Sequence, residues 1–166
     1  MAQRLAAVQG NNSVAGLNKS DIDKPYKVGY IAGVFDLFHI GHLNMFKRAK
    51  EQCRYLIVGV VSDEGVRLNK QAEPFVPFDE RIEMVRSCKY VDEAIKLPLD
   101  FCGTRDMFKI YHFDVQFSGS DYEHDPAWLA EKEFLEKNGS TMVFFPYTQS
   151  TSSTKLKRAI ENRINN

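Results

Sequence analysis

Short apolar runs alternate with segments of helical apolar spacing along the chain from about residue 27 onward. A run rich in β-formers at residues 28–34 predicts a buried strand, and Tyr-Leu-Ile-Val-Gly-Val-Val at 55–61 predicts a second. Between these runs, Leu43, Phe46 and Ala49 share one face of a predicted helix whose other sides are basic. The first third of the chain therefore reads as strand, helix, strand.

The rest of the chain continues this alternation. Residues 94–97, 115–117 and 141–145 are predicted strands, and the predicted helices cover 79–88, 104–111, 126–137 and 152–164. In the helix at 79–88, Asp79 is the expected N-cap and the inward side chains are those of Ile82, Met84 and Val85. Pro126 suits a first helical turn. Such alternation predicts an α/β fold: one domain with a Rossmann-like, parallel five-stranded sheet and helices on both faces.

Residues 1–24 lack this pattern. They are polar and turn-prone, as in Gly10-Asn11-Asn12-Ser13, and we expect a disordered tail before a domain at 25–166. The alternative is a segment that packs on a partner subunit.

Composition narrows the class of ligand. The 166 residues hold 22 basic and 22 acidic side chains, so excess positive charge for a broad nucleic-acid or anionic-membrane surface is missing. Any bound anion must therefore be met by a local pocket. No run approaches 18 apolar residues, so no membrane insertion is expected. The cysteines Cys53, Cys88 and Cys102 lack CxxC spacing, which favours a reducing compartment and a cytoplasmic location.

The turn after the first predicted strand carries candidate chemistry. Ligands of parallel sheets bind beyond the carboxyl ends of the strands, and a helix N-terminus offers free N–H groups to an anion. Gly33 lets a phosphate approach the backbone, and His39 and His42 are spaced to face one phosphate group, with Gly41 between them. Zinc binding is the rival, but no third ligand follows at a usual distance. We therefore predict phosphate chemistry and no protein-bound metal.

Residues 33–42 read Gly-Val-Phe-Asp-Leu-Phe-His-Ile-Gly-His. This string resembles the HxGH signature of nucleotidyltransferases, in the GxFDxxHxGH form of the cytidylyltransferases that act on glycerol 3-phosphate, choline phosphate and ethanolamine phosphate. The similarity runs from about residue 27 to 163. It implies that His39 and His42 are catalytic, and that nucleotide contacts come from Gly33, Val34, Phe35, Asp36 and Gly41. From its position, Asp36 is expected to orient the turn rather than to bind metal.

A second segment, residues 80–93, resembles the ERxxxVxxxxYVDE block of the same enzymes. The resemblance implies that Arg81 binds nucleotide, that Lys89 is a catalytic cation and that the protein is a homodimer. Lys70 stands where family members carry a phosphate-contacting lysine. The alternatives without a functional role are that residues 80–93 are only an amphipathic helix leading into a strand, and that Lys70 is only a solvated charge in a loop.

The match weakens toward the C-terminus. Residues 118–122 are similar to a Gly-Asp-Asp-Trp-like segment, which implies nucleotide contacts from Gly119 and Asp121. Tyr122, His124 and Trp128 are the candidates for acceptor selection, against the alternative that Trp128 simply packs on the core.

After the last predicted strand, relatives read Arg-Thr-Glu-Gly-Ile-Ser-Thr, whereas Tyr147 replaces the Arg here and the Glu is also missing. The following residues instead resemble the ISSTxIR motif of adenylyltransferases. Hydroxyls and amides at a helix start still form a phosphate cradle, with Lys155 or Arg158 as substitutes for the lost Arg. The residues expected to bind nucleotide here are Thr148, Ser152, Ser153 and Thr154.

The expected activity is that of a cytidylyltransferase, which moves CMP from CTP to a small phosphorylated alcohol, such as glycerol 3-phosphate or a similar polyol or amino-alcohol phosphate, and releases pyrophosphate. Mg²⁺ is expected to bind mainly through the triphosphate. Two alternatives stay open: an adenylyltransferase that uses ATP and a sugar- or cofactor-phosphate, and a nucleotide-binding regulatory module with little turnover.

Overall fold

The computed structural model describes residues 23–97, 103–146, 148 and 150–164. Its centre is one five-stranded sheet in the order β3-β2-β1-β4-β5, in which every neighbouring pair is parallel. The strands are β1 (Tyr26–Gly33), β2 (Cys53–Val60), β3 (Glu93–Lys96), β4 (Val115–Gly119) and β5 (Thr141–Phe145). The predicted α/β class and parallel five-stranded sheet are confirmed.

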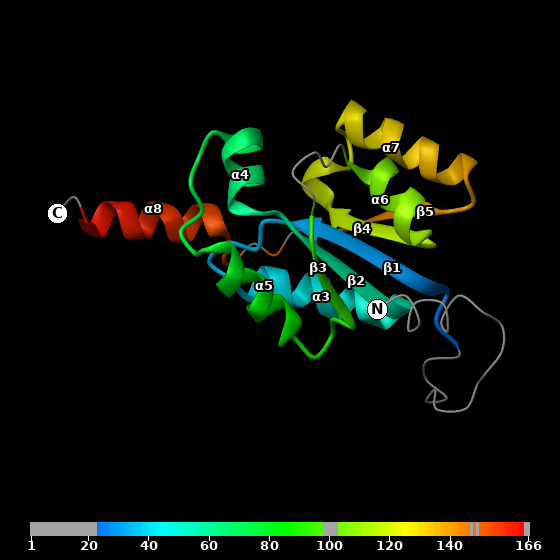
Figure 1. The fold of residues 1–166 in the computed structure, drawn as a ribbon, viewed down its shortest axis with the longest axis horizontal. Helices are drawn as coiled ribbons and strands as arrows, with labels where there is room; N and C mark the ends of the chain where they lie inside the picture. The colour runs from blue at the N-terminus through cyan, green and yellow to red at the C-terminus, as the bar shows by residue number, and fades with distance from the viewer. Residues whose placement is uncertain (1–22, 98–102, 147, 149, 165–166) are drawn as a thin grey trace.

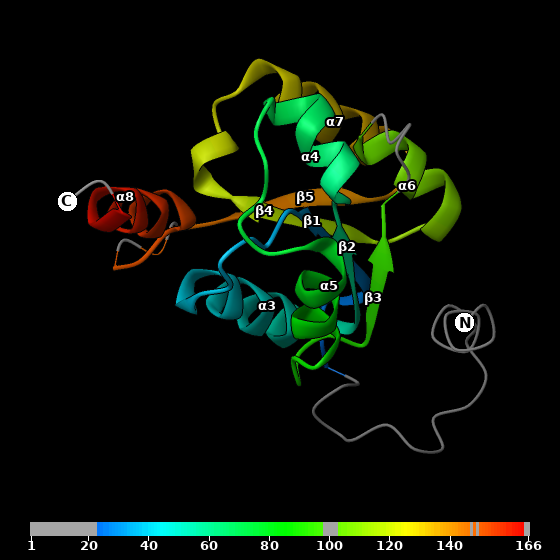
Figure 2. The same ribbon diagram turned by 60° about the vertical axis from the view of Figure 1, so that its left-hand side comes forward.

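Helices cover both faces of the sheet, as Figures 1 and 2 show. On one face lie α3 (Ile40–Gln52) and α5 (Phe78–Arg86), and on the other α6 (Thr104–Tyr111) and α7 (Pro126–Lys137). Each face has its own apolar core. Phe46 of α3 and Val85 of α5 belong to the first core, while Met107 of α6 and Leu135 of α7 belong to the second. The sheet is thus buried on both sides, which explains its nearly continuous apolar strands.

The strand order places β1 at the centre, with β2 on one side and β4 on the other. The chain moves outward from β1 through β2 to β3, then crosses by α6 to β4 and moves outward again to β5. The strand order therefore reverses between β1 and β4. A crevice outside the carboxyl ends of these two strands is the expected ligand site of such a sheet.

The helix α5 differs from its prediction in two ways. It begins at Phe78 with Pro77 at the N-cap, not with Asp79, and the Phe78 amide donates instead to the Asp63 carboxylate at 3.1 Å. Met84, predicted to face inward, is 52% exposed, whereas Ile82 and Val85 are buried as expected. Asp79 was wrong as the N-cap because the helix starts earlier and takes its cap from another segment. Met84 was wrong as an inward residue because it lies two positions from Ile82 and so on the opposite side of the helix.

Two short elements were not predicted. The helix α4 (Asp63–Lys70) follows β2 directly, with Ser62 as its N-cap, and the 3-10 turn η1 (Ser120–Tyr122) follows β4. Both lie beyond the carboxyl end of a strand and so add to the rim of the expected crevice.

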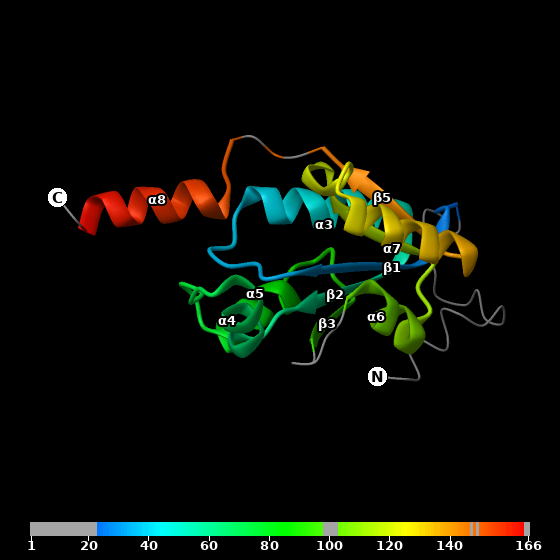
Figure 3. The same ribbon diagram turned by 90° about the horizontal axis from the view of Figure 1, so that it is seen from above.

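The last helix, α8 (Ser153–Ile164), begins one residue after its predicted start and has no buried residue. It projects away from the body of the protein, as Figures 1 and 3 show. Within the described residues, no helix is both long and apolar enough to cross a membrane. Most of the predicted tail, together with Cys102, Tyr147 and Gln149, lies outside the described residues.

Candidate active site

A pocket of about 350 Å³ opens beyond the carboxyl ends of β1 and β4. It collects segments that are far apart in the sequence: the turn after β1, the end of α4, the residues after β4, one side chain of α7 and the start of α8. The predicted site residues that line it are His39, Gly41, His42, Lys70, Gly119, Asp121, Tyr122, Trp128, Thr148, Ser153 and Thr154. Lining residues that sequence reasoning missed are Ala32, Met45, Arg48, Phe117, Ser118, Phe145, Pro146 and Thr151.

His39 is the N-cap of α3, and its hydrogen bonds fix the tautomer of the neutral ring. Its Nδ1 accepts the Gly41 amide at 3.0 Å, so the proton of the neutral ring belongs on Nε2. Nε2 lies 3.2 Å from Oγ of Ser153, which in turn donates to the Asp36 carbonyl at 2.8 Å. Burial lowers the pKa of His39. The ring is therefore a neutral N–H donor that faces the start of α8.

His42 stacks on His39 with ring centroids 3.9 Å apart. Phe35 and Phe38 pack against it at centroid distances of 5.3 and 5.5 Å. Burial, with a smaller effect from His39, lowers the pKa of His42 to about 3. Both imidazoles are thus neutral near pH 7 and would stabilise a phosphate by hydrogen bonding rather than as cations. We call His39, His42, Phe35 and Phe38 the histidine wall.

The backbone of this turn depends on close approaches. A Cβ atom on Gly41 would lie 2.7 Å and 2.9 Å from atoms of the His39 ring, so glycine is required for the cap geometry. Phe35 and Leu37 both adopt the left-handed backbone conformation, with φ of 54° and 49°. Such conformations are unfavourable for side chains with a Cβ and persist only where surrounding contacts impose them.

Those contacts come largely from Asp36, which is 3% exposed. Its two carboxylate oxygens accept the amides of Phe75 and Val76 at 3.0 Å each, and Oδ2 pairs with Nζ of Lys157 at 2.8 Å. Burial acts to raise the pKa of Asp36, but the hydrogen bonds from Lys157, Phe75 and Val76 together hold it below its usual value. The ionised carboxylate is engaged within the chain, which supports the expected orienting role.

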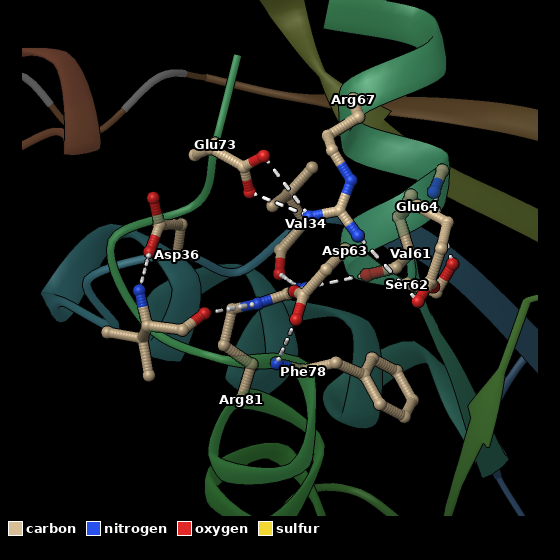
Figure 4. A network of polar contacts seen from close by, with 12 residues as sticks. Val34, Asp36, Val61, Ser62, Asp63, Glu64, Arg67, Glu73, Phe78 and Arg81 are labelled. Carbon is tan, nitrogen blue, oxygen red and sulfur yellow. Dashed lines mark hydrogen bonds and ion pairs between the residues drawn. The ribbon is translucent and has the colours of Figure 1, made fainter.

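Arg81 lies beneath the turn rather than in the pocket. It is 1% exposed, and its guanidinium donates to the carbonyls of Val34, Val61 and Val76 and to the carboxylate of Asp63. Figure 4 shows this arginine at the centre of the network, with Asp63 above the start of α5. Nucleotide binding was expected of Arg81, but its position assigns it to holding three loops together.

Other predicted residues also lie outside the pocket lining. Lys89 precedes β3, at the amino end of that strand, and its ammonium lies 5.1 Å from the Tyr90 ring centroid. His124 is exposed beyond η1, and Ser152 is a buried cap that accepts the Lys155 amide at 3.2 Å. Gly33, Val34, Phe35 and Asp36 do not line the pocket, although the Phe35 ring packs against His42. The structure therefore gives Lys89 and His124 no contact with this pocket.

The pocket lining beyond the histidines has two further parts. The hydroxyl residues Ser153 and Thr154, at the N-terminus of α8, line the pocket and are called here the α8 wall. Next to them Tyr122 and Trp128 stack at 4.5 Å with an interplanar angle of 26°. A helix N-terminus attracts a phosphate, and an aromatic pair offers a flat surface to a base or an acceptor.

The described part of the chain offers little to a metal ion. Among the described residues no cluster of three or more His, Cys, Asp or Glu side chains has metal-binding geometry. Asp121 lines the pocket, while the carboxylate of Asp36 is already engaged. A hard cation at this site would need ligands from a bound phosphate.

Comparison with known proteins agrees with this geometry. The profile of a family described as cytidylyltransferase-like matches residues 30–159. The FAD synthase of Thermococcus kodakarensis is 36% identical over 81% of this chain and 89% of its own length. The glycerol-3-phosphate cytidylyltransferase of Bacillus subtilis is 32% identical over 77% and 92%. For the ethanolamine-phosphate cytidylyltransferase of Dictyostelium discoideum, at 34% identity, the match covers 83% of this chain but only 39% of the relative.

Among solved structures, a lipopolysaccharide core biosynthesis protein from Thermoplasma volcanium is similar in fold, with a TM-score of 0.61 at 25% sequence identity. The similarity covers 76% of this chain and 99% of that one.

Proposed function

The chain belongs to the cytidylyltransferase-like family and is a nucleotidyltransferase, and from this premise we propose that it transfers CMP from CTP to a small phosphorylated alcohol. Glycerol 3-phosphate, or a similar polyol or amino-alcohol phosphate, is the proposed acceptor, and pyrophosphate is the second product. The relative of similar length from Bacillus subtilis, a glycerol-3-phosphate cytidylyltransferase, supports this choice.

One observation carries the proposal: the stacked pair His39 and His42 lies beside the N-terminus of α8 in one pocket, with Nε2 of His39 3.2 Å from Oγ of Ser153. The imidazole N–H groups, the helix dipole and the Ser153 and Thr154 hydroxyls therefore converge on the same pocket. Lys70 lines the same pocket and adds a positive charge. This arrangement suits an extended polyphosphate better than a single carboxylate.

The proposed step is an in-line attack. A phosphate oxygen of the acceptor bonds to the α-phosphorus of CTP, the bond from this phosphorus to the bridging oxygen breaks, and that oxygen leaves with pyrophosphate. A phosphomonoester is mostly dianionic at neutral pH, because its second pKa is about 6, so no strong general base is required. Catalysis then consists of positioning two anions and stabilising charge at the α-phosphate and leaving group.

Mg²⁺ fits the site only when it is coordinated mainly by the phosphate oxygens of the nucleotide, since the described residues offer no cage of carboxylates. When bound, it would neutralise charge on the triphosphate. The residues of the chain would then hold and orient the polyphosphate: His39 and His42 at the transferred phosphate, Lys70 and the α8 wall along the leaving group, with Asp121 near the cation.

ATP is the second candidate donor. It is favoured by the Ser-Ser-Thr sequence at residues 152–154, which resembles an adenylyltransferase motif, and by the similarity to an FAD synthase. With ATP, the acceptor would be a sugar- or cofactor-phosphate.

A panel assay tests the proposal. Each nucleoside triphosphate is combined with Mg²⁺ and with each of a set of acceptor phosphates, and pyrophosphate release is measured. Turnover with CTP alone supports the first candidate, and turnover with ATP alone replaces it with the second. Nucleotide binding without turnover on any acceptor would identify a regulatory module instead.

Substitution of the site histidines provides the matched test. His39→Ala and His42→Ala are each expected to abolish most turnover, whereas His124→Ala, outside the pocket lining, is expected to keep it within about threefold. Full turnover in both site variants would exclude the mechanism.

A further inference from the structure

Polar contacts contribute to the orientation of α8, because only half-buried side chains such as Leu156 and Ile160 pack it against the body of the protein. None of its twelve residues is buried, and the helix projects from the body of the protein. Its first turn nevertheless forms the α8 wall of the pocket. A small tilt or rotation of this helix would therefore move the N–H groups and hydroxyls that face a phosphate.

Two contacts, one helical turn apart, attach α8 to a single residue. Oγ of Ser153 donates to the Asp36 carbonyl at 2.8 Å, and Nζ of Lys157 pairs with Oδ2 of Asp36 at 2.8 Å. Residues four apart lie on the same helix face, so the two contacts together fix the rotation of α8 about its axis. Removing the Lys157 contact would leave Asp36 attached to α8 only through Ser153, so that rotation of the helix would be less restrained.

Asp36 is a firm anchor for this attachment. Its side chain is 4% exposed and is also held by the amides of Phe75 and Val76, in the loop that follows α4. In Figure 4, Asp36 stands where the turn after β1 meets this loop. The ammonium of Lys157 additionally lies 5.1 Å from the centroid of the Phe75 ring. One carboxylate thus joins the histidine wall, the loop next to Lys70 and the α8 wall.

We propose that Lys157 is a positioning residue for nucleotide binding, which acts by locking the N-terminus of α8 against the histidine wall through Asp36. This inference rests on the proposed nucleotide site. Lys157 does not line the pocket, and its ammonium is engaged by Asp36, so its effect on a triphosphate is indirect. It differs in this from Lys155 and Arg158, the cations expected from the sequence to replace a phosphate-binding arginine.

Trp128, the only tryptophan, lines the pocket and provides a binding signal that does not require turnover. Titration of Trp128 fluorescence with Mg-CTP and Mg-ATP gives the Kd of each nucleotide. Lys157→Met is expected to raise this Kd about tenfold, and Lys157→Arg, which can keep the ion pair, less than about threefold. Arg163→Met, at the exposed far end of α8, is the matched control and should stay within about twofold. A Kd unchanged by Lys157→Met would overturn the proposal.

A double-mutant cycle separates positioning from direct phosphate binding. If Lys157 acts through Asp36, then adding Lys157→Met to Asp36→Asn raises the Kd less than about twofold further. If Lys157 instead contacts the triphosphate, the tenfold loss appears in both backgrounds, and the positioning role is wrong.

Hydrogen–deuterium exchange of the nucleotide-free protein tests the same point without Asp36→Asn, which is at risk of not folding. Lys157→Met is expected to speed amide exchange across α8 at least fivefold, and Arg163→Met to leave it unchanged. Equal exchange in Lys157→Met and the unsubstituted protein would contradict the inference. Because this measurement needs no nucleotide, it gives an answer even if the panel assay rejects the proposed function.

Discussion

The two walls of the pocket are held in place by different forces. The histidine wall is held by aromatic packing. His42 contacts Phe35 and Phe38, and Phe35 contacts Phe46 of the first core, the one beneath α3 and α5, at a centroid distance of 5.1 Å. The α8 wall has no such packing and depends on hydrogen bonds and one ion pair to Asp36. The histidine wall is therefore continuous with the apolar core, whereas the α8 wall belongs to a peripheral helix.

This difference predicts different responses to solution conditions. Burial of aromatic side chains is only weakly affected by moderate salt, but a partly exposed ion pair such as Lys157–Asp36 is screened by it. The histidine wall is thus suited to holding the transferred phosphate in a fixed geometry, and the α8 wall to adjusting around the rest of the nucleotide.

The largest expected effect comes from breaking the histidine wall. His42→Ala and His42→Phe should each lower kcat about 100- to 1000-fold, because each removes a hydrogen-bond donor in a water-poor site. His42→Phe keeps an aromatic ring against Phe35 and Phe38, so its melting temperature should stay closer to that of the unsubstituted protein than that of His42→Ala. Steady-state pyrophosphate release and thermal unfolding measure the two effects. A His42→Phe variant with ordinary kcat would show that the ring packs but does not act.

The next effect concerns the support under that wall. Arg81→Met should lower the free energy of unfolding by about 3 kcal/mol, because it leaves the buried carbonyls of Val34 and Val61 and the carboxylate of Asp63 without their donor. Arg86→Met is the matched control on the same helix. Its exposed pair with Glu83 should be worth less than about 0.5 kcal/mol.

Urea unfolding measures both Arg81→Met and Arg86→Met. If Arg81→Met instead unfolded normally and weakened only nucleotide binding, Arg81 would be a ligand, as its motif first indicated.

The smallest effect, per pH unit, is a pH dependence specific to the histidine wall. The pKa of His42 is about 3 in the folded protein and about 6.5 in an unfolded chain. Between these values the unfolded state binds more protons, so this residue makes the free energy of unfolding fall by about 1.4 kcal/mol for each pH unit lost below about 6. Comparing urea unfolding of the unsubstituted protein and His42→Phe between pH 4 and 7 isolates this slope. Parallel curves for the two proteins would mean that His42 is protonated as readily when folded as when unfolded.

Most of the fold could be predicted because its elements have clear periodic patterns. The limits of α6, α7 and β5 coincide with the predicted ranges, and the other strands differ by one or two residues at their ends. The helix α4 was missed because only Gly65 and Val66 of its eight residues are buried, so it has almost no apolar pattern. Met84 was misplaced because it is apolar, although a residue two positions from Ile82 lies on the opposite side of a helix.

The site shows a similar division. His39 and His42 could be assigned to the pocket because parallel strands bring their carboxyl ends together, and Asp121 because its segment resembles that of the family. Arg81 and Lys89 could not be placed, since a motif states which residue types recur but not whether an individual side chain is buried or turned away. Lys157 gave no signal at all, because its contact with Asp36 joins positions 121 residues apart.

The left-handed backbone at Phe35 and Leu37 bears on how such a chain can be improved. The left-handed conformation costs each of these residues roughly 1 kcal/mol of folding free energy. Selection for heat tolerance alone would therefore favour glycine at Leu37, whose relaxed turn no longer fixes the two imidazoles. Selection for turnover would retain the strained residue. Thermal stability and turnover rate therefore place opposite demands on Leu37, so a thermostable variant of this enzyme is best sought by substitutions elsewhere in the chain.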